Sequence, residues 1–268
     1  MSRRSGACFT FLPLCLLALA SWLTILCSSR QPARFEVERA WAAPDASHLL
    51  GCTDGGVDVA TYVAFAAGYV VVLALVVAFI SSILGTLVGT AATMLGKNAD
   101  RVLLRICDLV QAFPNFLLAL AVLSAVQSPK RWHIGMVFLL TSWAGFARLA
   151  VVMSRRLATA DFVLAARAYG ASPWAILTRH GIPHVFGPIA VQIGTVGAGV
   201  VLSESALSFV GLGPADGISL GLLIEQGALG MLRAPHVLAV AFVAVVVTSG
   251  GFQLAAEGIR SWVQVDRV

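Results

Sequence analysis

Residues 161–183 read DFVLAARAYGASPWAILTRHGIP, and this polar stretch lies between two long apolar runs. Each of those runs is long enough to cross a bilayer, since a membrane helix needs about 20 apolar residues. The stretch is therefore a loop between two membrane spans. It belongs to residues 154–185, the longest loop that we place on the cytoplasmic side, which makes it the first candidate for a functional part.

Apolar runs also account for most of the remaining chain. Hydrophobic residues make up 59% of the 268 residues and charged residues only 12%, which is outside the range of soluble globular proteins. We predict an all-α integral membrane protein with about six transmembrane helices, at 7–27, 62–90, 109–127, 132–153, 186–210 and 236–256.

The second of these runs is unusually long. No charged residue falls between Asp58 and Lys97, which favours one long, tilted helix that protrudes into the cytoplasm. Small residues recur at every fourth position in it, at Ser81, Gly85, Gly89 and Thr93. Such a face allows close helix packing, and we interpret it as packing within the bundle rather than as a dimerisation surface.

The distribution of basic residues predicts the orientation. With both termini in the cytoplasm, 12 of the 18 Lys and Arg residues lie inside and 6 outside, in agreement with the positive-inside rule. The net charge of +5 then follows from topology, and binding of nucleic acid is not expected. Residues 1–28 have an uncharged run too long for a signal peptide and no cleavage site, so we expect an uncleaved anchor.

The chain is predicted to have two parts. Residues 1–60 comprise the N-terminal anchor helix and an external segment, and residues 61–268 form a five-helix core. The external stretch 211–235 carries several glycines and is predicted to be irregular, with a re-entrant or surface helix. The five cysteines show no metal-binding spacing. Cys27 and Cys52 would both lie at the outer face, where they could form a disulfide.

Within the cytoplasmic loop the sequence predicts two short helices. The first runs from Asp161, which complements the helix dipole, to Tyr169. Gly170 supplies a stop that tolerates a positive φ. Ser172 then caps a second helix, in which Pro173 is the first helical residue and residues 174–180 follow.

One face of the first predicted helix carries Phe162, Ala165, Ala166 and Tyr169, at positions i, i+3, i+4 and i+7. This face is aromatic at its ends and flat in the middle, which suits a protein groove. A helix that rests on lipid headgroups would show the same pattern, and periodicity alone does not decide between the two.

Four motifs, in order along the chain, carry a resemblance to a known family. They are Leu50-Gly51 with Gly56 and Asp58; Asp108-x-x-x-Ala112-Phe113-Pro114; Ala165-Ala166-Arg167-Ala168-x-Gly170-Ala171-Ser172 with Arg179-His180-x-x-Pro183; and Glu204-x-x-Leu207-Ser208-Phe209-x-Gly211-Leu212-Gly213. From about His48 to its C-terminus the chain resembles the dipeptide/oligopeptide/nickel class of ABC-importer permeases. In that family the third motif is the cytoplasmic "EAA" loop, which grips a separate ATPase.

The resemblance implies a Type I (MetI-like) ABC importer permease of the bacterial inner membrane, which imports peptides or similar small solutes. The implied partners are a second permease subunit, two ATP-binding subunits that hold ATP and Mg, and an extracytoplasmic solute-binding protein. This chain is then no enzyme and binds no cofactor or metal. The implied ATPase-coupling residues are Asp161, Phe162, Ala165, Ala166, Arg167, Gly170, Ser172, Arg179, His180 and Pro183.

The chain departs from the family pattern in two of the motifs. Leu164 stands where the coupling motif has its leading Glu, and this change removes one charge-assisted contact to the ATPase. In the external motif Cys52, Thr53 and Val57 replace Thr, Asp and Arg respectively.

Polar groups at membrane depth are costly and point to function. Asp108 begins the third span, where it could be hydrated, paired with Arg105 or part of a translocation path. Glu204 could hydrogen-bond to a neighbouring helix or line the same path. Pro114 is predicted to kink the third span and to place the Asn115 amide inside the bundle. The candidate path residues are Asp108, Pro114, Asn115, Ser203 and Glu204.

Two other functions fit parts of the sequence. An ion-coupled secondary transporter would use Asp108 and Glu204 as proton sites, and a membrane subunit without transport would give them no such role. The sequence contains no nucleotide-binding, zinc-protease or serine-hydrolase motif, and its five histidines are scattered. We therefore expect ATP hydrolysis on a separate chain.

Overall fold

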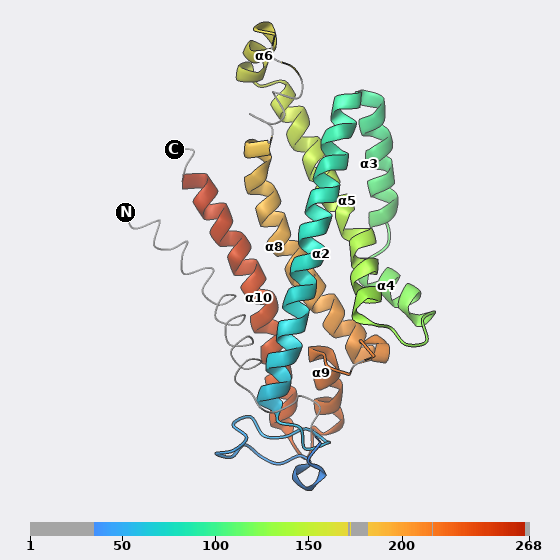
Figure 1. The fold of residues 1–268 in the computed structure, drawn as a ribbon, viewed down its shortest axis with the longest axis vertical. Coiled ribbons are helices and arrows are strands. Elements are labelled where there is room, and N and C mark those ends of the chain that lie inside the picture. Colours follow the sequence, from blue (N-terminus) through green and yellow to red (C-terminus); the bar gives the residue numbers. More distant parts are fainter. Residues whose placement is uncertain (1–34, 171, 173–181, 216, 266–268) are drawn as a thin grey trace.

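The computed structural model describes residues 35–170, 172, 182–215 and 217–265. Within these ranges the regular structure is helical, apart from an isolated bridge between Cys52 and Asp58. Four long helices run along the long axis of the molecule (Figure 1): α2 (Val59–Leu95), α5 (Arg131–Ala158), α8 (Ile182–Leu207) and α10 (Pro235–Val265). All four contain a window long and apolar enough to cross a membrane, which confirms the predicted class of fold.

Six shorter elements complete the described chain. They are η1 (Val37–Arg39), α3 (Lys97–Gln111), α4 (Asn115–Ser124), α6 (Asp161–Ala168), a π-helical turn η3 (Ser208–Leu212) and α9 (Leu220–Leu229). The predicted span at 7–27 lies outside the described residues. Helix α9 and the glycine-rich turns before it confirm the prediction of an irregular stretch with a short helix at 211–235.

Helix α2 is a single helix of 37 residues, as the sequence predicted. Its length is roughly 55 Å, well beyond a hydrocarbon core of about 30 Å. The Asp58 carboxylate caps its first turn by accepting hydrogen bonds from the Thr61 N–H at 3.0 Å and the Thr61 hydroxyl at 2.6 Å. Gly96, with φ 109°, ends the helix, and α3 begins at the next residue.

The third predicted span, 109–127, is kinked at Pro114, as the sequence predicted. Helices α3 and α4 are bent by 67° at residues 112–114, and residues 93–102, between the second and third predicted spans, are helical except at Gly96. Pro114 causes the bend because it disfavours helical geometry at Phe113 and lacks an N–H for the helical ladder. The described chain therefore has four membrane-span candidates, or five if the bent pair counts as one span.

Glycines set the closest helix contacts of the bundle. A Cβ atom at Gly85 would lie 2.6 Å from the Cβ of Phe146, and one at Gly89 would lie 2.8 Å from the Cβ of Ala150. Helices α2 and α5 therefore pack at a distance that only glycine allows. Because this face is buried within the chain, the predicted role in bundle packing is confirmed.

The two ends of the bundle differ in what they carry (Figure 1). Helix α6 and the turn between α2 and α3 lie at one end, which we call the α6 end. The segment 35–58 and helix α9 lie at the other, which we call the cap end. Helix α10 begins near the cap and reaches toward the α6 end.

Candidate coupling surface and translocation path

Helix α6 is joined to α5 by only two residues, Thr159 and Ala160. The Thr159 hydroxyl donates to the Arg156 carbonyl at 3.0 Å, and the Ala160 N–H donates to the Leu157 carbonyl at 3.0 Å. The Val163 N–H then donates to the Ala160 carbonyl at 2.9 Å, and the Val163 side chain is fully buried. This short, hydrogen-bonded connection fixes α6 to the end of a long rigid helix.

Part of the face predicted for α6 is exposed. Tyr169 is 92% exposed, Ala165 is exposed and Ala166 is half-buried. Asp161 opens the helix and is exposed, and Gly170 follows with φ +80°. Both predicted helix boundaries are therefore confirmed to within a residue.

The structure describes only some of the other predicted coupling residues. Phe162 and Arg167 lie on α6, Ser172 is exposed beyond Gly170, and Pro183 lies in the first turn of α8. Arg179, His180 and the predicted second helix at 174–180 lie outside the described residues.

Two ion pairs join α3 to α5, side by side in antiparallel order. Asp100 and Arg155 are 2.8 Å apart, and the Asp100 side chain is only 5% exposed. Asp108 and Arg148 are 2.7 Å apart, with about half of each side chain exposed. The suggested pairing of Asp108 with Arg105, one turn earlier on α3, is thus wrong: Arg148 reaches Asp108 from the facing helix instead.

Asn115 is exposed at the start of α4, so the prediction of an amide inside the bundle is wrong for this chain. Asn115 follows directly after the break at which α4 is bent by 67° from α3. Pro114 lies at the bend as predicted, and it is exposed as well.

Glu204 belongs to a tightly packed junction. It is 3% exposed and accepts a hydrogen bond from the Ser208 hydroxyl at 2.9 Å, one turn along. A Cβ atom at Gly221 in α9 would overlap the Ser205 carbonyl and lie 2.7 Å from the Ser208 Cβ. The junction thus holds α9 directly against the end of α8. Ser203, beside it, is half-buried on the other side of the helix.

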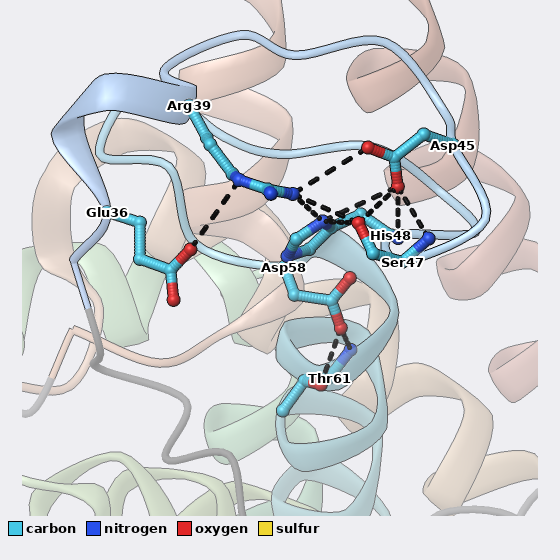
Figure 2. Close-up of polar contacts among 7 residues, drawn as sticks. All are labelled: Glu36, Arg39, Asp45, Ser47, His48, Asp58 and Thr61. Atoms are coloured by element: carbon cyan, nitrogen blue, oxygen red, sulfur yellow. Dashed lines mark hydrogen bonds and ion pairs between the residues drawn. The ribbon is translucent and has the colours of Figure 1, made fainter.

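At the cap end, polar contacts fold the segment 35–58 onto itself (Figure 2). Arg39 Nη1 lies 2.9 Å from His48 Nδ1 and 3.0 Å from the Ser47 hydroxyl oxygen. The Asp45 carboxylate accepts from the Ser47 hydroxyl at 2.6 Å and from the His48 N–H at 2.6 Å. The Ser47 hydrogen bond, followed by that from the His48 backbone, lowers the pKa of Asp45 to about 2.

The residues that depart from the family's external motif all point inward in this segment. Cys52, Thr53 and Val57 are 0%, 2% and 6% exposed, and the Thr53 N–H donates to the Val57 carbonyl at 2.9 Å. The two positions that carry Asp and Arg in the family pattern are thus neighbours, and both are neutral here. Cys52 is a free thiol whose pKa is raised by burial, and Cys27 lies outside the described residues.

The sequence of this chain is similar to those of known transport proteins. Residues 81–256 match the family model described as "binding-protein-dependent transport system inner membrane component". A putative peptide transport system permease protein of Brucella suis is 32% identical over 246 residues, which cover 90% of this chain and 80% of the relative. A glutathione transport system permease protein of Pectobacterium atrosepticum is 30% identical over 254 residues, 92% of this chain and 82% of the relative. A probable D,D-dipeptide transport system permease protein of Escherichia coli K12 is 25% identical over 257 residues, 96% of this chain and 85% of the relative.

Proposed function

The chain belongs to the family of binding-protein-dependent transport system inner membrane components, and we propose that it is the permease subunit of an ATP-driven importer of peptides or similar small solutes. The proposal for the solute comes from its relatives, which are named for peptide, glutathione and D,D-dipeptide transport. All three kinds of solute are small and contain amide bonds.

The observation that carries the proposed mechanism is the exposure of Ala165 and Tyr169 on α6 and directly after it, at the end of α5. A short helix with such exposed positions fits a groove on an ATP-binding subunit. We propose that this groove holds α6 and that closure of two ATP-binding subunits pulls on it. Because α6 is fixed to α5, and α5 to α2 and α3, the pull would move these helices as one body.

The same proposal assigns the orientation. The α6 end would face the cytoplasm and the cap would face outward, toward the solute-binding protein. Arg155 and Arg156 in the last turn of α5 support this assignment, since basic residues favour the cytoplasmic side. The acidic groups of segment 35–58, such as Asp45 and Asp54, would then lie outside. A second permease subunit would complete the membrane part.

ATP and Mg would be bound by the partner subunits, and this chain would bind no cofactor. Under this proposal the candidate path residues have two different roles. Asp108, Pro114 and Asn115 are exposed on this chain and would face the passage, whereas Glu204 would hold α8 and α9 together. The ion-coupled alternative has no support from the relatives, all of which are named as permease components of transport systems.

A matched pair of substitutions, one at each end of the molecule, tests the proposal. Ala165→Trp adds bulk to the middle of the proposed docking face, and Ala43→Trp adds the same bulk to an exposed position in segment 35–58, at the cap end. We expect Ala165→Trp to lose co-purification with the ATP-binding subunit and ATP-dependent uptake, while both variants reach the membrane in equal amounts. Equal binding of the ATP-binding subunit by both variants would refute the assignment of this face.

A further inference from the structure

Three helices bring polar side chains together on a face outside the chain's own core. A Cβ atom at Gly145 in α5 would lie 3.5 Å from the amide nitrogen of Gln111 on α3 and 3.5 Å from that of Gln192 on α8. Gln111 is exposed, and Gly145 and Gln192 are half-buried. Two carboxamides thus flank an open position on α5 that has no side chain.

A charged pair lies beside this amide pair. Asp108 precedes Gln111 by three residues on α3, and Arg148 follows Gly145 by three on the antiparallel α5. Their side chains are 52% and 41% exposed. Arg148 Nη2 donates to Asp108, whereas Arg148 Nε has no hydrogen-bond partner within the described residues. One surface therefore presents two amides, a carboxylate and a guanidinium.

The polar surface continues along α8 toward the cap end. Gln192, Thr195, Gly199 and Ser203 follow each other at intervals of three or four residues and are all exposed or half-buried. In the part of the chain that the structure describes, a Cβ atom at Gly199 would meet nothing within 4 Å. Gly194 and Gly197, on another side of the same helix, pack against α10, where a Cβ at Gly194 would lie 2.6 Å from the Ala256 Cβ. Helix α8 thus has a packed side and an open, small and polar side.

Contact with lipid would be unfavourable for the open, polar side of α8. Charged and amide groups that face hydrocarbon lose hydrogen bonds to water and are costly. The exposed residues on the other side of the same helices, such as Leu109 on α3 and Leu140 on α5, are apolar and suit lipid. The contrast separates a lipid-facing side of the bundle from a side that faces water.

We infer that this polar face is one wall of the solute passage and that Gln111 and Gln192 determine its specificity for peptides. A carboxamide carries both a donor and an acceptor, as the peptide group does, so the two side chains can hydrogen-bond to main-chain amides of a passing peptide. Asp108 and Arg148 lie where its charged ends can interact. The inference rests on the proposed function, which supplies the opposite wall as a second permease subunit.

Cysteine accessibility in the assembled complex tests the inference. Single cysteines replace Gln111, Gln192 and Thr195 in a background that lacks the native cysteines, with Leu109→Cys and Leu140→Cys as lipid-side controls. A charged methanethiosulfonate is the probe. We expect the first three to react faster by on the order of tenfold, because the reactive thiolate forms in water and not in hydrocarbon. Equal labelling rates at all five positions would refute the inference that this face is a wall of the passage.

Two further measurements separate the parts of the inference. A mixture of random tripeptides should slow labelling at positions 111 and 192, and a mixture of sugars should not; no protection by tripeptides would overturn the assigned specificity. Gly145→Leu, which fills the space between the amides, should slow labelling of Gln192→Cys, whereas Gly145→Ala should not. If the ATP-binding subunit still co-purifies while these results fail, the proposed function stands without this passage.

Discussion

The two ends of the molecule use positive-φ glycines in opposite ways. In the cap, Gly56 has φ +72°, and a Cβ atom there would overlap the Glu36 carbonyl; Gly51 has φ +76° and no room beside His236. At the α6 end Gly170 has φ +80°, but a Cβ atom there would meet nothing within 4 Å among the described residues. The cap glycines allow both a turn and close packing, whereas Gly170 allows only the turn.

Side chains follow the same division. The polar groups of segment 35–58 are joined to one another in a local network (Figure 2), and Cys52, Thr53 and Val57 are buried beneath it. On α6, Val163 is buried while Tyr169 and Ala165 are exposed. The cap is largely complete within this chain, and α6 presents a surface that a partner can cover.

The largest expected difference between the two ends comes from one substitution made at each. Gly56→Ala should lower the stability of the protein by about 2–4 kcal/mol, because it combines a left-handed backbone with an overlap that forces the chain apart. Gly170→Ala meets only the backbone cost, about 1–2 kcal/mol, and only locally. Thermal unfolding in detergent measures the stability of both variants. A similar fall in unfolding temperature for the two would show that the two glycines do not differ in their packing.

A second pair of variants tests whether α5, the helix that carries α6, is held to α3 by the buried ion pair. Arg155→Met leaves Asp100 buried and without its partner, which should cost about 3 kcal/mol. Arg148→Met breaks an ion pair that is about half exposed and should cost at most about 1 kcal/mol. Denaturant titration of the two variants checks the order. Equal losses would show that α3 and α5 are not held mainly by the buried pair.

The smallest expected effect is a pH dependence confined to the cap. Asp45 has a folded-state pKa of about 2, below its value in an unfolded chain, so its contribution is present above pH of about 4 and is lost as the pH falls toward 2. The protection factors of the cap amides against hydrogen exchange should fall as the pH drops across this interval, while those of α2 and α5 stay constant. Asp45→Asn should remove the transition. A transition of the same size in that variant would assign it to another group.

The sequence predicted well wherever a local pattern decides the structure. The long α2, the small-residue face at Gly85 and Gly89, and the boundaries of α6 at Asp161 and Gly170 all depend on residues near one another in the chain. Hydrophobic length, helix packing and helix termination are local rules, and each was confirmed.

Features that depend on facing helices could not be predicted in the same way. Arg148 lies 40 residues from Asp108, and the sequence offered Arg105, one turn away, as a nearer partner. The bend at Pro114 was expected, but not that it would split the span into two helices and expose Asn115. The approach of Gln111 to Gln192 depends on three helices, and neither residue stood out in the sequence.

The placement of Tyr169 against an ATP-binding subunit is the most direct test of the account. A photoreactive phenylalanine at position 169, with Phe35 on the cap as the matched exposed control, would be activated in native membranes that contain the assembled transporter. We expect a covalent adduct with the ATP-binding subunit from position 169 and none from position 35. Adducts from position 169 with lipid alone, or with the external solute-binding protein, would contradict it.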